Sequence, residues 1–230
     1  AAAAAAAAQA TAEAAQAAAE ADLAAALNPA GQSFALTSAN DIQANGAGDD
    51  TNTGTSATYN AGDVITDAGG ADTLNLTLTA DAAAATVVNV ETINASFNTF
   101  AAPTFAAANV SGASINITQS ALGGSANGTV TGLGATNTVT FGAGITGTAT
   151  VTVTGAATVN GGDAVTLTVN DAGTAGVTII ADDDTNTINL NDAAAAATSA
   201  ASISAAGTVA LDAEDTAGQD VELLTLSGNG

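Results

Sequence analysis

Hydrophobic and polar residues alternate in short runs over most of the chain. Leu, Val or Ile alternates with Thr or Asn at residues 74–78, 151–153 and 165–169. Similar short runs occur at 93–95, 115–117, 139–141, 188–190, 209–211 and 224–226. Alternation of this kind is typical of strands with one buried face. Gly, Asn and Asp cluster between the runs, where turns are expected. The pattern predicts a mainly β protein.

The spacing of the runs favours a parallel β-solenoid built of short strands rich in Thr, Val, Gly and Asn. Successive runs begin roughly 20 residues apart, within the range of one solenoid coil. Several runs also follow an earlier apolar residue, such as Val90 before Ile93 and Leu133 before Val139, which would fill a corner of the coil. Because the intervals vary, an antiparallel β-sandwich remains the alternative.

The first part of the chain has a different composition. Residues 1–27 are dominated by Ala, the strongest helix former, and Asn28 and Pro29 follow. We expect a short N-terminal α-helix and linker over residues 1–33 and a β-strand repeat domain over 34–230. The repeat ends directly after a strand, so we expect further coils or another subunit to cover that edge. Polar residues interrupt the Ala-rich segment, so no membrane span is expected.

Composition limits the chemistry. The chain has 22 acidic residues, no Lys, Arg or His and no Cys, and its formal charge is −22. Without basic residues it has no phosphate clamp and no basic patch for nucleic acid. Without His and Cys the usual nucleophilic triads are absent, so we expect no enzyme, although a carboxylate-only hydrolase is the remaining alternative. The charge must be balanced from outside the chain, and a hard cation held by oxygen atoms, above all calcium, is the candidate.

Two segments fit parts of a calcium-binding nonapeptide pattern, G-G-x-G-x-D-x-U-x, where U is apolar. Residues 45–52 match most of it, and residues 67–74 match its later half. The glycines permit a tight turn and the aspartates supply carboxylates. We therefore predict metal ligands in and between these segments: Asp49, Asp50, Asp63, Asp67 and Asp72. The alternative is an ordinary Asx-Gly turn that binds no metal.

A third acidic segment follows the strand predicted at residues 177–180. Asp182, Asp183 and Asp184 are consecutive, and a bound ion would relieve their mutual repulsion. A solvated acidic turn explains them equally well. We include the three aspartates among the predicted metal ligands.

Several segments of the first β region share a family resemblance: those at 34–37, 46–51, 59–65 and 69–76, and Val-Glu-Thr-Ile-Asn at 90–94. Through these segments, residues 34–95 resemble a stretch of bacterial surface-layer proteins, which are calcium-dependent, RTX-like and exported by type I secretion. The resemblance implies a cell-surface location, a β-solenoid, calcium-dependent order and assembly into a lattice. Members of that family usually contain Lys and Arg, and this chain departs from them there.

Together these observations predict a structural subunit of an extracellular bacterial surface layer, sheath or filament. Calcium would bridge acidic turns within and between copies, giving a homo-oligomer, with a cell-surface polysaccharide as a further candidate partner. The alternative is a calcium-dependent adhesin or biofilm matrix protein. A binding module of that kind should show an aromatic cluster on its loops, and the candidates are Phe97, Phe100 and Phe105.

Overall fold

The fold is defined by a computed structural model of the chain. It describes residue 16 and residues 31–120, 126–164, 166–171, 176–181, 187–192, 200–205, 210–215 and 223–228. The helix predicted for residues 1–27 lies outside these residues except for Gln16, which is helical. Among the described residues, no helix is long and apolar enough to cross a membrane.

The described strands form three sheets. The ten-stranded sheet contains β1 (Ser33–Ala35), β3 (Thr51–Thr55), β5 (Thr73–Leu78), β7 (Thr92–Phe97), β10 (Ser114–Gln119), β12 (Thr138–Phe141), β14 (Thr158–Asn160), β16 (Val177–Ala181), β18 (Ala200–Ala205) and β20 (Leu223–Gly228). The four-stranded sheet contains β2 (Ile42–Ala44), β4 (Val64–Thr66), β6 (Thr86–Val88) and β9 (Val110–Ser111). The six-stranded sheet contains β8 (Thr104–Ala106), β11 (Gly128–Leu133), β13 (Thr148–Val153), β15 (Thr166–Asp171), β17 (Thr187–Asp192) and β19 (Ala210–Asp215).

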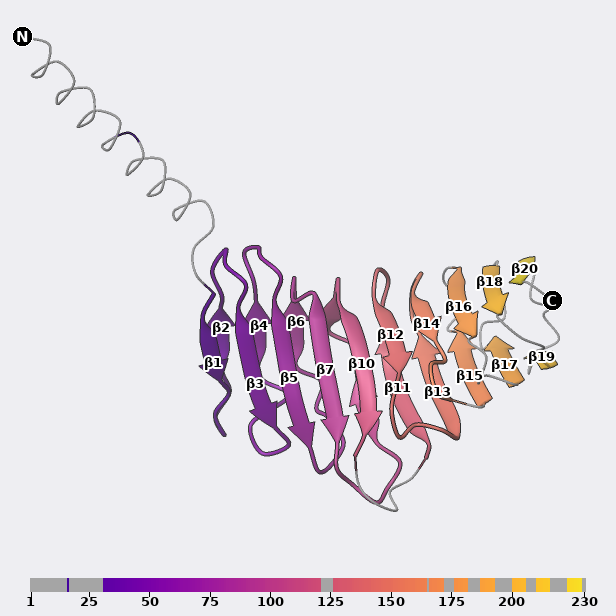
Figure 1. Ribbon diagram of the computed structural model, residues 1–230, viewed down its shortest axis with the longest axis horizontal. Coiled ribbons are helices and arrows are strands. Elements are labelled where there is room, and N and C mark those ends of the chain that lie inside the picture. The colour runs from indigo at the N-terminus through magenta and orange to yellow at the C-terminus, as the bar shows by residue number, and fades with distance from the viewer. Residues whose placement is uncertain are drawn as a thin grey trace, which may run out of the picture.

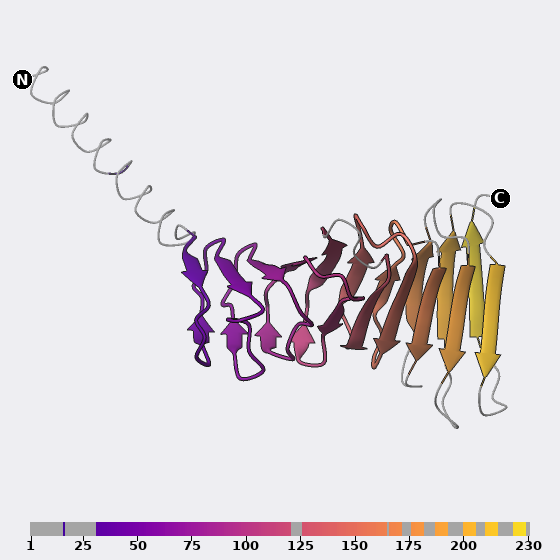
Figure 2. The same cartoon turned by 90° about the horizontal axis from the view of Figure 1, so that it is seen from below.

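The prediction of a parallel β-solenoid is confirmed. Each described strand pairs in parallel with the strand one coil away, as β3 does with β5 and β13 with β15. The antiparallel sandwich is therefore wrong for the described part of the chain. One coil advances the chain by 18 residues from Ser33 to Thr51 and by 24 from Ser114 to Thr138. This variation explains why the run spacing alone left the sandwich open. Figures 1 and 2 show the coils stacked along the long axis.

Alternation along each strand divides its side chains between the core and the outer face. Apolar side chains stack inward in columns, one of which contains Leu74, Ile93, Ile115, Val139, Val159 and Ile179, all fully buried. Thr, Asn and Ser occupy the outward positions between them. Because a parallel coil has only a thin interior, each coil buries its apolar face against its two neighbours. The stack therefore forms one continuous core.

The first coils depart from this rule. In β3 the inward position next to Leu74 is taken by Asn52, which is fully buried, and Asn45 and Asp50 are also buried nearby in sequence. Both polar atoms of the Asn52 amide lack a hydrogen-bond partner. Burial of an unpaired amide is costly, so Asn52 stabilises this end of the core less than an apolar residue would.

Candidate metal centre

Two glycine-rich corners connect the four-stranded sheet to the ten-stranded sheet. Residues 45–50 lead from β2 to β3, and residues 67–72 lead from β4 to β5. They stack on each other so closely that a Cβ on Gly70 would lie 2.4 Å from the carbonyl oxygen of Gly48. Gly70 also has φ +133°, which an L side chain rarely adopts. The glycines therefore allow two acidic corners to lie one directly above the other.

Acidic side chains at the strand starts cap the preceding coil. Asp50 Oδ1 accepts a hydrogen bond from Gln32 N at 2.6 Å, and Asp72 Oδ1 accepts one from Asp50 N at 2.6 Å. Glu91 Oε2 accepts one from Asp72 N at 2.8 Å. Such charge-assisted bonds are short and strong. This column of carboxylates, which we call the β3–β7 cap column (Asp50, Asp72 and Glu91), explains why an acid stands at each of these positions.

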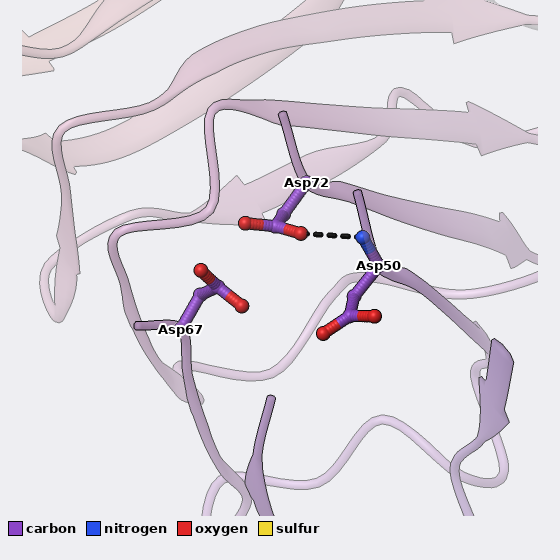
Figure 3. A group of neighbouring side chains, drawn as sticks. All are labelled: Asp50, Asp67 and Asp72. Atoms are coloured by element: carbon purple, nitrogen blue, oxygen red, sulfur yellow. Dashed lines mark hydrogen bonds between the residues drawn. The ribbon is translucent and has the colours of Figure 1, made fainter. Parts of the chain in front are cut away.

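Two carboxylates of this column converge with a third, that of Asp67. Asp50, Asp67 and Asp72 each offer one oxygen atom that lies within 4.8 Å of the other two. Their side chains are 1%, 6% and 0% exposed. Figure 3 shows the three carboxylates turned toward a common space from the two stacked corners. We call these residues the aspartate trio. They are buried on a chain that has no basic side chain to pair with them.

The protein's own hydrogen bonds do not use all of the trio's oxygen atoms. Asp50 Oδ2 accepts from Gly46 N at 2.8 Å, and Asp67 Oδ2 accepts from Gly69 N. Asp67 Oδ1 and Asp72 Oδ2, however, are buried and have no partner. An unpaired buried carboxylate oxygen carries the full cost of desolvation. A cation between the two corners would remove that cost.

Asn45 lies one coil away from Asp67 and adds a neutral oxygen to the same corner. Its backbone N–H donates to Thr66 O at 2.8 Å, which places it beside Asp67 in the stack. Its side chain is buried, and its amide oxygen and nitrogen are both unpartnered. The sequence pattern marked Asn45 only as a replacement for a glycine. Its unusual burial becomes visible only in the fold.

Electrostatics in the trio oppose full ionisation. The pKa of Asp72 is raised from 3.8 to about 6, chiefly by burial and also by the neighbouring negative charges of Asp67 and Glu91. The hydrogen bond from the Asp50 amide opposes this rise. Without a cation the cluster therefore retains a proton in mildly acidic solution. The arrangement could hold a metal ion through oxygen ligands alone.

The other predicted ligands lie elsewhere or outside the described residues. Asp49 is exposed, and its Oδ1 accepts from Ala71 N at 2.9 Å. Asp63 is fully buried at the start of β4, where its two oxygens accept from Asp41 N at 2.9 Å and Asn60 N at 2.7 Å. Asp182, Asp183 and Asp184 lie outside the described residues. Of the eight predicted ligands, the structure brings Asp50, Asp67 and Asp72 together.

The aromatic residues considered for an adhesive surface divide between core and solvent. Phe97 and Phe105 are fully buried, and Phe105 stacks on Tyr59 with ring centroids 6.5 Å apart. Phe100 alone of the three is exposed, at 77%. These three residues therefore do not form one aromatic cluster on a loop.

Fold and site together define a class: a parallel β-solenoid with a buried carboxylate cluster between two of its corners. Comparison with known proteins does not narrow this class, because no protein family, no curated protein and no solved structure matches the chain.

Proposed function

We propose that the chain is a calcium-binding structural subunit of an extracellular bacterial surface layer, sheath or filament. The observation that carries the proposal is the aspartate trio, with two buried and unpartnered carboxylate oxygens on a chain without a basic side chain. The resemblance of residues 34–95 to surface-layer proteins supports the bacterial surface as the location.

The ligand chemistry favours calcium. Every candidate ligand is an oxygen atom, and calcium takes six to eight of them at about 2.3–2.6 Å. Two oxygens on one such ion lie at most about 5 Å apart, and the trio's oxygens lie within 4.8 Å of one another. Magnesium binds at about 2.0–2.1 Å, demands near-octahedral geometry and usually keeps several waters, which suits a buried corner less well.

Three side chains have oxygen atoms that are free to bind the ion. Asp67 Oδ1 and Asp72 Oδ2 have no competing hydrogen bond, and the amide oxygen of Asn45 is also unpartnered. Asp50 would join them by sharing the oxygen that already accepts from Gly46 N. An ion bound there would join the β2–β3 corner to the β4–β5 corner. Its role would be structural, because it would fix the stacking of two coils.

A structural role also suits the rest of the molecule. A solenoid is rigid and repetitive, and each coil is stabilised by packing against its neighbours. On a chain of charge −22, close contact between copies is opposed by repulsion unless cations intervene. Calcium would therefore support both the fold and the assembly, and a surface polysaccharide is a further candidate partner for anchoring.

Calorimetric titration of the metal-free chain tests the ion directly. We expect calcium to bind and magnesium to bind more weakly. Asp67→Asn and Asp72→Asn should each weaken calcium binding at least tenfold, whereas Asp49→Asn, a matched change at an exposed carboxylate in the same corner, should leave it unchanged. Equal weakening by all three variants, or no binding at millimolar calcium, would overturn the metal assignment.

Electron microscopy tests the assembly. We expect sheets or filaments in calcium that dissolve in EDTA and reform when calcium is restored. Assemblies that survive exhaustive chelation would contradict the role of calcium, and scattered single fibres on a cell surface would favour the adhesin instead.

A further inference from the structure

The outer face of the ten-stranded sheet carries a regular array of small uncharged side chains. Its first column has a hydroxyl residue in each strand from β1 to β16: Ser33, Thr51, Thr73, Thr92, Ser114, Thr138, Thr158 and Thr178. The next column contains Thr53, Asn75, Asn94, Asn116, Thr140 and Asn160, and it continues in β16 with the exposed Ile180. In both columns, the side chains of β3 to β14 are exposed or half-buried, so the array faces outward.

None of the chain's 22 acids lies in the ten strands of this sheet. The six-stranded sheet differs, since Asp171 and Asp192 stand in register in β15 and β17, and Asp212, Glu214 and Asp215 lie in β19. Among the described strands, acids therefore occur in the six-stranded sheet, and the strands of the ten-stranded and four-stranded sheets contain none.

Polar side chains in the second column already hydrogen-bond within the protein. Asn94 Nδ2 donates to Asn75 Oδ1 at 2.9 Å, and Asn116 Nδ2 donates to Asn94 Oδ1 at 2.9 Å. Thr53 Oγ1 likewise donates to the carbonyl oxygen of Phe34, in the preceding coil. Amide ladders of this type occur in dry interfaces between stacked sheets. Polar atoms that already have partners cost less to bury.

We propose that this face is a docking surface for the same face of a second copy of the chain. The inference rests on the proposed role as a self-assembling subunit and adds the surface through which two copies meet. Two −22 chains can approach most closely where neither presents a carboxylate. Small side chains at identical spacing on both faces would interdigitate from β1 to β14.

The size of the face is sufficient. The ten strands lie about 4.8 Å apart and have a mean length of about 16.5 Å, which gives roughly 790 Å². A stable interface buries about 800 Å² on each partner. The acids of the corners would then lie at the rim, where calcium can bridge them. The pair would be isologous, because each copy uses the same patch.

A matched pair of charge insertions tests the docking. Ser114→Glu places a carboxylate in β10, the fifth of the ten strands, at an exposed position. Thr150→Glu places one in β13, centrally in the six-stranded sheet. Both variants add one negative charge, so general repulsion changes equally. By sedimentation of the full chain in calcium, we expect Ser114→Glu to weaken self-association at least tenfold and Thr150→Glu to leave it within twofold of the parent chain.

Cross-linking gives a second readout that does not depend on the variants' stability. The chain has no Cys, so single cysteines report their own neighbours. Asn116→Cys should form disulfide-linked dimers in calcium, and Thr168→Cys in β15 should not. Far-UV circular dichroism checks that each variant folds.

Several outcomes would overturn the docking face. Equal effects of Ser114→Glu and Thr150→Glu, cross-links through Thr168→Cys alone, or a parent chain that stays monomeric in calcium each do so. Retention of monomers on an insoluble polysaccharide, abolished by Ser114→Glu, would assign the face to a glycan and also overturn it. Calcium binding measured by calorimetry is independent of these results, so failure of the docking face and failure of the metal assignment are distinguishable.

Discussion

Two buried aspartates at successive corners of one coil have opposite hydrogen-bonding states. Asp63, before β4, uses both carboxylate oxygens to accept backbone N–H groups. Asp72, before β5, uses one oxygen and leaves the other buried without a partner. Both are fully buried and both cap the preceding coil. Capping of the preceding coil therefore explains why an acid stands at both positions. Only the unpartnered oxygen of Asp72 indicates a bound ion.

The largest effect is expected from removing the satisfied carboxylate. Asp63→Ala leaves the part-buried amides of Asp41 and Asn60 without their acceptor, and each costs somewhat less than a fully buried group, for which the cost is about 1–3 kcal/mol. We expect a loss of about 2–4 kcal/mol in denaturant unfolding, equal in calcium and in EDTA. A loss that appears only in calcium would place Asp63 among the ion's ligands.

Calcium itself should stabilise the chain by a comparable amount. A ligand at 100 times its Kd that binds only the folded state contributes about 2.7 kcal/mol. For a domain of this size the corresponding rise in Tm is about 5–10 °C. Thermal melts in EDTA and in millimolar calcium check this, with magnesium as the control ion. Coincident melts would contradict the metal centre.

Asp72→Asn should separate the two roles of this side chain. The amide oxygen can still accept from Asp50 N, while the negative charge beside Asp67 and Glu91 disappears. In EDTA we expect stability equal to or up to about 1 kcal/mol above that of the parent chain, since relief of an unpaired buried charge is favourable. In calcium the variant should lose most of the stabilisation by the ion. A variant equally destabilised in both conditions would mean that Asp72 acts only as a cap.

The pH dependence should reverse with calcium. In the metal-free chain the pKa of Asp72 is raised from 3.8 to about 6, so the folded state binds more protons than the unfolded state between these values. Stability in EDTA should therefore fall as pH rises from about 4 to about 6 and then level off. In calcium it should rise over the same window, because the ion requires the deprotonated carboxylate. Urea titrations between pH 4 and 8 measure both slopes, and Asp72→Asn should flatten each.

The smallest effect is expected at the exposed neighbour of the trio. Asp49→Asn keeps an oxygen that can accept from Ala71 N, and its side chain is solvated. Stability and calcium affinity should both stay close to those of the parent chain. A tenfold loss of affinity, equal to that expected for the trio variants, would overturn the assignment of the ion to the aspartate trio.

Much of the fold could be predicted from local pattern. The alternation in β5 and β7 and the spacing of about one coil between Leu74 and Ile93 indicate stacked parallel strands. The sandwich remained open because coil length varies, and only the pairing of each strand with its counterpart one coil away excluded it. Glycine-rich repeats located the corners correctly, since their turns need conformations that other residues avoid.

The candidate site could be predicted only in part. The repeat pattern selected Asp50 and Asp72, but also the exposed Asp49. Position between the two repeats added Asp67, which joins the trio, and equally Asp63, whose oxygens are both occupied. It also gave no role to Asn45 or to the cap formed by Glu91. Sequence spacing fixes where a carboxylate falls along the coil. It cannot tell whether backbone N–H groups of the next coil already use its oxygens.

The sequence alone determined the strand periodicity, the acidic corners and the need for a counter-ion from outside, because a chain without basic residues cannot neutralise its own carboxylates. The tertiary structure decided which carboxylates meet, since stacking brings residues about one coil apart into contact. It also decided which strands form the ten-stranded sheet, and these strands contain no acidic residue. The register between neighbouring strands, and not their order along the chain, aligns the hydroxyl residues on one face.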